Sequence, residues 1–130
     1  MYTNMTTNLM VQSVDKAITF YTEILEFSVL TSVPGKNNEL QFAILTKDNL
    51  MIMVQEKNNF IEEYPVLNTK KIHASVSLYI TVDNLDELYD NIQAQHPINT
   101  EIHTSFYGMR EFAITDVDGY VLTFAEHNEN

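Results

Sequence analysis

Histidine and glutamate side chains are the groups in this sequence best suited to bind a metal ion or transfer a proton. His103 and Glu101 lie in the segment EIHTSF, where alternate residues of a strand are expected to share a face. A zinc or iron site uses three or four donors, so we interpret this pair as solvated or ligand-facing. Glu56 and Glu126 would need proximity and unlike environments to act as acid and base, and we interpret them as solvated strand ends.

The sequence lacks the residue patterns of other catalytic sites. His73, His96 and His127 fall in a connector, beside Pro97 and in the C-terminal tail, and are interpreted as surface or loop residues. The sequence has no cysteine, which excludes disulfides, thiolate metal sites and cysteine nucleophiles. It also has no Gly-x-Ser-x-Gly turn and no phosphate-binding glycine loop. We therefore predict no catalytic residue, no metal and no cofactor.

The composition indicates one compact domain that does not bind nucleic acid. The chain has 130 residues, of which 45% are hydrophobic, enough for one domain with its own core. Its formal charge of −11 disfavours phosphate backbones and favours a cationic ligand if it is focused in a groove. The start MYTNMTTN lacks an export pattern, and no run approaches the roughly 18 apolar residues of a membrane helix. We expect a cytoplasmic protein without a membrane partner.

The elements that must position these residues form an internal repeat. The segment FAILTKDNLMIMVQE, which starts at Phe42, returns as FAITDVDGYVLTFAE, which starts at Phe112. Each copy is typical of two strands joined by a tight turn, at Asp48-Asn49 and at Asp118-Gly119. The segments SVLTSV and EIHTSF predict one further strand before each hairpin.

A strand and a capped helix are predicted upstream in each half. Ser13 and Asn84 are the predicted N-caps, and Asp15 favours the positive end of the first helix dipole. Apolar residues then recur at helical spacing: Val14, Ala17, Ile18, Tyr21, Ile24 and Leu25 in the first half, and Leu85, Leu88, Tyr89 and Ile92 in the second. The alternation of Leu78, Ile80 and Val82 with polar residues predicts the strand that precedes the second helix.

These patterns predict an α+β fold of two tandem βαβββ modules within a single domain, residues 1–130. Module one spans about residues 5–56, a connector without strong periodicity spans about 57–74, and module two spans about 75–127. In each module the helix covers one sheet face and leaves the other open. We expect the two modules to form a curved mixed sheet around a groove.

The paired modules resemble the vicinal oxygen chelate superfamily, which includes glyoxalase I, extradiol dioxygenases and bleomycin-resistance proteins. The resemblance rests on the helix start QSVDKAITFY and the hairpin DVDGYVLTFAE, and it spans about residues 6–126. The segment YGMREFAITDVDGYVLTFAE is similar to the closing segment of bleomycin-binding resistance proteins. The resemblance implies the glyoxalase/bleomycin resistance fold and a homodimer.

Metal-using members of this family place ligands, usually His, Gln or Glu, on the first and last strands of each module. The caps and turns put Thr6, Met53, Ser77 and Thr123 at those four positions. Hydroxyl groups bind such metals weakly and a thioether suits softer ions. A register shift of two residues supplies no histidine or carboxylate, since it brings in Met51, Tyr79 or Val121.

Aromatic and methionine side chains make good walls for a planar or cationic guest. The candidate ligand-binding residues are Phe42, Met51, Met53, Ser77, Tyr79, His103, Tyr107, Arg110 and Thr123. An ordinary core position is the favoured alternative for Phe42, and also for Phe112 and Phe124. Arg110, the only arginine, either anchors an anionic ligand group or, as we favour, pairs with a carboxylate such as Glu111 or Asp116.

The predicted function is that of a metal-free small-molecule binding protein resembling bleomycin resistance proteins. It would sequester an aromatic or cationic ligand in the groove and so act in antibiotic resistance, which requires affinity but no catalytic group. One alternative is a metal-dependent glyoxalase, related lyase or dioxygenase whose ligands lie elsewhere. The other is a non-enzymatic scaffold or regulatory partner.

Overall fold

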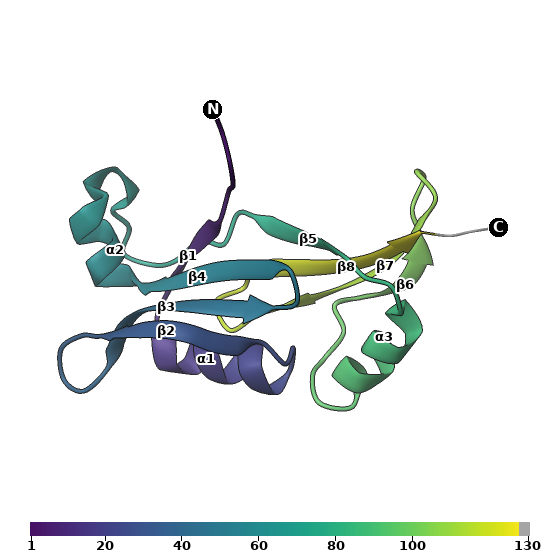
Figure 1. The fold of residues 1–130 in the computed structure, drawn as a ribbon, viewed down its shortest axis with the longest axis horizontal. Coiled ribbons are helices and arrows are strands. Elements are labelled where there is room, and N and C mark those ends of the chain that lie inside the picture. Colours follow the sequence, from purple (N-terminus) through teal and green to yellow (C-terminus); the bar gives the residue numbers. More distant parts are fainter. Residues whose placement is uncertain (128–130) are drawn as a thin grey trace. The chain divides into compact units, whose positions relative to one another are not determined.

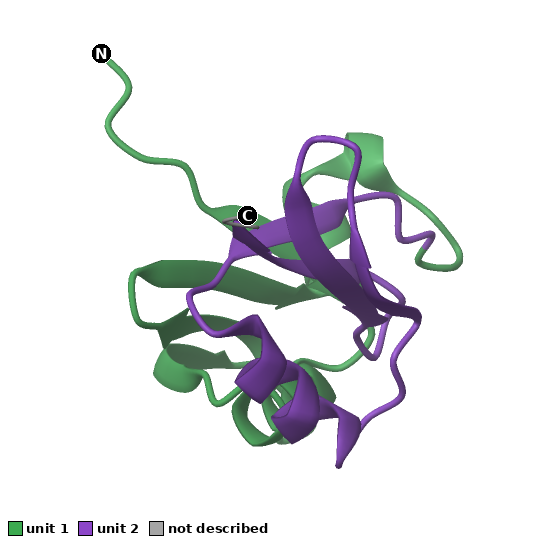
Figure 2. Cartoon of the chain, turned by 90° about the vertical axis from the view of Figure 1, so that its right-hand side faces the viewer, with its two compact units in different colours: residues 1–72 green, residues 73–130 purple. Residues whose placement is uncertain are grey.

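The computed structural model describes residues 1–127, which form parts of two compact units (Figures 1 and 2). Unit 1 comprises residues 1–72, and unit 2 begins at His73. Each unit contains one four-stranded mixed sheet, with strand orders β1-β4-β3-β2 and β5-β8-β7-β6. The predicted α+β architecture of two tandem βαβββ modules is confirmed.

In unit 1, a parallel pair of strands is extended by an antiparallel hairpin. Strand β1 runs parallel to β4, while β2 and β4 flank β3 in antiparallel order. The elements are β1 (Thr7–Val11), α1 (Val14–Glu23), β2 (Ser28–Pro34), β3 (Leu40–Lys47), β4 (Leu50–Glu56), α2 (Lys57–Glu63) and the 3₁₀ helix η1 (Pro65–Leu67).

Residues 73–127 of unit 2 repeat the connectivity of β1, α1, β2, β3 and β4. Strand β5 runs parallel to β8, and β6 and β8 flank β7 in antiparallel order. The elements are β5 (Ser77–Thr81), α3 (Leu85–Gln93), β6 (Thr100–Thr104), β7 (Met109–Thr115) and β8 (Val121–His127).

Local capping and turn chemistry places the helices and hairpins where the sequence predicts them. Ser13 accepts a hydrogen bond from the Lys16 N–H at 3.2 Å, and Asn84 accepts one from the Glu87 N–H at 3.4 Å. Both predicted N-caps are therefore confirmed. The turn residues Asp48 and Gly119 have φ angles of 51° and 93°, the left-handed region that favours the residue types found there.

One face of each sheet packs against a helix and forms the core. Helix α1 buries Val14, Ala17, Phe20 and Tyr21. Helix α3 buries Leu85 and Ile92 over β7 and β8, where Phe112 and Phe124 are also buried. The core interpretation of Phe112 and Phe124 is confirmed, and alternation along the strands leaves the opposite sheet face uncovered by α1 or α3 (Figure 1).

The segment after β4 forms an element that the sequence pattern did not reveal. Helix α2 starts directly at the end of β4, and the Glu56 carboxylate accepts hydrogen bonds from the N–H groups of Asn58 and Asn59 at 2.8 and 3.0 Å. Glu56 is the last residue of β4 and is half-buried, so the strand-end interpretation holds, but the sequence did not reveal that its side chain also caps a helix. In residues 1–127, no helix is both long and apolar enough to cross a membrane.

Candidate functional site

The uncovered face of the first sheet carries a cleft of about 410 Å³. Two predicted ligand-binding residues, Phe42 and Met53, line it together, and Met53 lies opposite Asn8 of β1 in the sheet register. The full lining is Asn8, Val33, Gln41, Phe42, Met53, Gln55, Asn59, Glu63 and Tyr64. The predicted residue Met51 is exposed and lies outside this lining. Ligand sites typically occupy about 300–1,000 Å³, so the cleft is large enough for a small molecule.

A hydrogen-bonded network forms the polar side of the cleft. The Gln55 side chain, which is 5% exposed, accepts a hydrogen bond from Asn8 Nδ2 at 2.8 Å. Its own amide nitrogen donates to Asn59 Oδ1 at 2.7 Å and to Glu63 Oε1 at 3.0 Å. The network joins β1 and β4 to α2, whose residues Asn59 and Glu63 form part of the wall of the cleft.

The uncovered face of the second sheet carries a second group of polar side chains, the Glu111 cluster, which consists of Tyr79, His103, Tyr107 and Glu111. The hydroxyls of Tyr79 and Tyr107 both donate to Glu111 Oε2, each at 2.9 Å. His103 Nε2 lies 3.7 Å from Glu111 Oε1, and the Glu111 side chain is only 12% exposed. The structure thus brings together three predicted residues around a buried carboxylate.

Sequence reasoning missed Glu111 as the centre of this cluster. The available signal was its alternation with the core residues Phe112 and Ile114 along β7, which places it on the face opposite the core. Of the remaining predicted residues, Thr123 lies opposite Tyr79, and Ser77 lies opposite Val121. Neither Ser77 nor Thr123 makes a side-chain hydrogen bond within residues 1–127.

The expectation that Glu101 and His103 share a face is wrong. The register between β6 and β7 shifts between Thr100 and His103, which inserts one extra residue into β6. Because a bulge of one residue reverses the alternation of side chains, His103 faces Glu111 while the Glu101 carboxylate accepts a hydrogen bond from the Tyr89 hydroxyl of α3. The two side chains therefore point to opposite faces.

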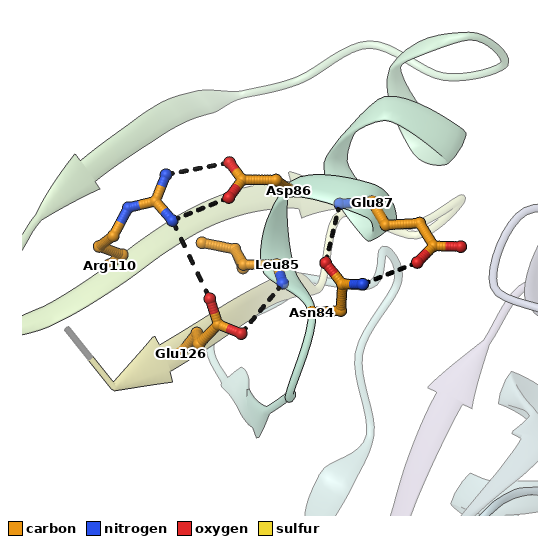
Figure 3. Close-up of polar contacts among 6 residues, drawn as sticks. All are labelled: Asn84, Leu85, Asp86, Glu87, Arg110 and Glu126. Carbon is orange, nitrogen blue, oxygen red and sulfur yellow. Dashed lines mark hydrogen bonds and ion pairs between the residues drawn. The ribbon is translucent and has the colours of Figure 1, made fainter. Parts of the chain in front are cut away.

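Arg110 lies on the face covered by α3 and not in the Glu111 cluster (Figure 3). Its guanidinium donates two hydrogen bonds to the Asp86 carboxylate, at 3.0 and 3.1 Å, and lies 3.9 Å from Glu126. The favoured ion-pair interpretation holds, but the suggested partners Glu111 and Asp116 are wrong, since alternation turns Arg110 toward the start of α3. The hydrogen bonds from Arg110 hold the pKa of Asp86 below its ordinary value.

Glu126 is also a structural residue and not the solvated strand end that the sequence suggested. Its carboxylate accepts a weak hydrogen bond from the Leu85 N–H at 3.4 Å, at the start of α3 (Figure 3). The positive end of the helix dipole and Arg110 both favour a carboxylate at this place. Glu56 and Glu126 therefore each bind the start of a helix.

The surroundings of Tyr79 in the Glu111 cluster raise the pKa of its hydroxyl. The Tyr107 hydroxyl, then burial and the Glu111 carboxylate raise the pKa of Tyr79 above the ordinary value of about 10. The resulting contribution to stability is present below pH of about 10 and is lost as the pH rises through the raised pKa. The test is a rapid-mixing pH titration followed by tyrosinate absorbance. Tyr79→Phe should remove absorbance change from the most alkaline part of the titration curve. Tyr2→Phe is the control, and an unchanged upper part in Tyr79→Phe would contradict the assignment.

Comparisons with known proteins match this fold over nearly the whole chain. The family model for the Glyoxalase/Bleomycin resistance protein/Dioxygenase superfamily matches residues 4–124. No curated protein matches the chain.

Several solved structures share the fold at low sequence identity. TioX from Micromonospora sp. ML1 is 19% identical, with a TM-score of 0.78 over 97% of this chain and 99% of that chain. A glyoxalase/bleomycin resistance protein/dioxygenase from Nocardioides is 15% identical, with a TM-score of 0.81 over 100% of this chain and 86% of that chain. Lactoylglutathione lyase from Agrobacterium tumefaciens is 18% identical, with a TM-score of 0.75 over 95% of this chain and 92% of that chain. At these identities the similarity establishes the fold alone.

Proposed function

The chain belongs to the Glyoxalase/Bleomycin resistance protein/Dioxygenase superfamily, and we propose that it is a metal-free binding protein that sequesters an aromatic or cationic small molecule. The observation that carries the proposal is the cleft of unit 1, whose volume of about 410 Å³ suits a small ligand. Sequestration lowers the free concentration of a ligand through affinity alone and needs no reacting group.

The lining of the cleft supports this ligand class. Phe42 and Tyr64 offer aromatic surface, and Met53 adds a polarizable side chain that adapts to the shape of a guest. Glu63 brings a carboxylate from α2, and the protein carries a formal charge of −11. A planar cation is therefore attracted by charge and held by contact with the rings.

The residues at the family's metal-ligand positions do not fit a divalent metal. Thr6, Met53, Ser77 and Thr123 supply three hydroxyls and a thioether, a weak donor set for the metals of glyoxalases and dioxygenases. Within residues 1–127, no three His, Asp or Glu side chains are grouped so that they could hold an ion. We derive no step that uses a metal.

We further propose that the protein is a homodimer that acts in antibiotic resistance in the cytoplasm. The family resemblance supports a homodimer, and a role in antibiotic resistance follows from the similarity to bleomycin-resistance proteins. The lack of cysteine is compatible with a cytoplasmic location. We also propose that the two units together make one domain.

Thermal shift assays with bleomycin and a set of planar aromatic cations test the proposal. A ligand at 100 times its dissociation constant should stabilise the protein by about 2.7 kcal/mol. Phe42→Ala should weaken binding about ten-fold or more, because it removes aromatic surface from the cleft. Leu30→Ala, which changes an exposed residue of β2 outside the cleft, should leave binding unchanged.

Two results would overturn the proposal. Stoichiometric Zn, Ni, Mn or Fe in protein purified without chelator would favour the glyoxalase or dioxygenase alternative. If no compound of the panel stabilises the protein, the scaffold alternative is favoured.

A further inference from the structure

No lysine or arginine side chain of the described residues forms an ion pair with the largely buried Glu111 carboxylate. Within residues 1–127, the basic side chain recorded within 4.0 Å of it is that of His103. Both tyrosine hydroxyls donate to the same oxygen, Oε2, so Oε1 accepts no hydrogen bond from the described residues. Glu111 Oε1 is not among the fully buried atoms without a partner, and the side chain is 12% exposed, so a charged donor from solvent can reach this acceptor.

The neighbouring imidazole does not supply that donor in its neutral form. His103 Nδ1 lies 2.9 Å from the backbone carbonyl oxygen of Glu101. Because a carbonyl oxygen only accepts hydrogen bonds, Nδ1 carries the hydrogen and Nε2 of the neutral ring presents a lone pair. Two acceptors, His103 Nε2 and Glu111 Oε1, thus face each other across 3.7 Å.

We propose that the Glu111 cluster recognises the protonated amino group of a small molecule, whose nitrogen donates one hydrogen to Glu111 Oε1 and another to His103 Nε2. The rings of Tyr79 and Tyr107 are about half exposed and offer aromatic surface beside the carboxylate. Ring faces of this kind attract a cation. The inference rests on the proposed function, because both require small molecules to reach the uncovered sheet faces.

This arrangement selects among cations. A primary ammonium has the two N–H donors that the facing acceptors require, whereas a quaternary ammonium has none. An alcohol lacks the charge that offsets the buried carboxylate, and a carboxylate ligand is repelled by it. The ligand class is therefore a primary or secondary amine in its protonated form.

Nuclear magnetic resonance titrations of the isotope-labelled full chain with small-molecule probes test this inference. The probes are benzylamine, benzyltrimethylammonium, benzyl alcohol and benzoate. Benzylamine should shift the amide signals of Tyr79, His103 and Glu111 in a saturable way. It should bind about ten-fold or more tightly than the other three probes.

Variants on the two faces of the β6–β7 hairpin distinguish a loss of amine binding from a loss of folding. Glu111→Gln should weaken benzylamine binding about ten-fold or more, because it removes the charge. Glu101→Gln is the matched control, since that carboxylate lies on the opposite face with Tyr89, and it should bind benzylamine as the wild type does. His103→Leu changes a half-exposed side chain and should weaken binding several-fold even if Glu111→Gln fails to fold.

The outcomes distinguish this inference from the proposed function. Equal binding of benzylamine and benzyl alcohol, or unchanged benzylamine binding in both Glu111→Gln and His103→Leu, would overturn the amine site. If planar cations still bind through Phe42 while benzylamine leaves the Glu111 cluster unchanged, the amine site alone fails. If no probe binds at either place, both proposals fail.

Discussion

Phe112→Ala is expected to lower the free energy of unfolding of unit 2 by about 3–5 kcal/mol. Phe112 is fully buried under α3, with its ring centroid 5.2 Å from those of both Tyr89 and Phe124. Truncation removes apolar burial and leaves a cavity that the surrounding strands fill only partly. Since domains are stable by only about 5–15 kcal/mol, this variant should be largely unfolded at moderate denaturant concentrations.

Urea unfolding followed by circular dichroism measures this effect. Phe106→Ala is the matched control, because Phe106 is 99% exposed at the turn between β6 and β7. Its substitution should change stability by no more than about 0.5 kcal/mol. Similar losses in the two variants would mean that Phe112 is not in the core of unit 2.

Gln55→Leu is expected to cost about 2 kcal/mol of stability and to weaken ligand binding in the cleft of unit 1. Leucine keeps much of the volume but removes the acceptor for Asn8 and the donor for Asn59 and Glu63. These groups then lose partners in a partly buried place, where water replaces them poorly. Helix α2 also loses its side-chain tie to β4, so the cleft should become less well defined.

The same denaturation assay and the ligand panel measure both consequences. Gln93→Leu is the control, because Gln93 is exposed on α3 and its side chain makes no hydrogen bond within residues 1–127. Hydrogen exchange of the α2 amides should increase in Gln55→Leu and stay unchanged in Gln93→Leu. Wild-type stability and wild-type α2 protection in Gln55→Leu would rule out the structural role of this network.

The cleft of unit 1 and the Glu111 cluster of unit 2 are both built around a buried polar side chain on a sheet face. Each uses the sheet face that α1 or α3 does not cover, and each places one deeply buried polar side chain, Gln55 or Glu111, among partners from other elements. Buried polar groups of this kind are stable only when their hydrogen bonds are satisfied. Both polar atoms of the Gln55 amide form hydrogen bonds within unit 1, whereas no described residue donates to Glu111 Oε1, which leaves this acceptor available to a ligand.

The sequence by itself determined the strands and the helices α1 and α3, but not α2, and it determined the face on which most side chains lie. Ser13 and Asn84 cap their helices, Gly119 adopts positive φ in its turn, and Phe112 and Phe124 enter the core as predicted. These features depend on interactions within a few residues or on simple alternation, so a single sequence contains them.

Only the tertiary structure decided which polar groups meet. The bulge in β6 separates Glu101 from His103, and Arg110 of β7 binds Asp86 of α3. Glu111 accepts hydrogen bonds from Tyr79, which is distant in the sequence, and from the nearby Tyr107. Such pairs depend on strand register and on how a helix docks, and a shift of one residue exchanges one face for the other. Periodicity cannot report that shift, because the residue types in a bulge are the same as in a regular strand.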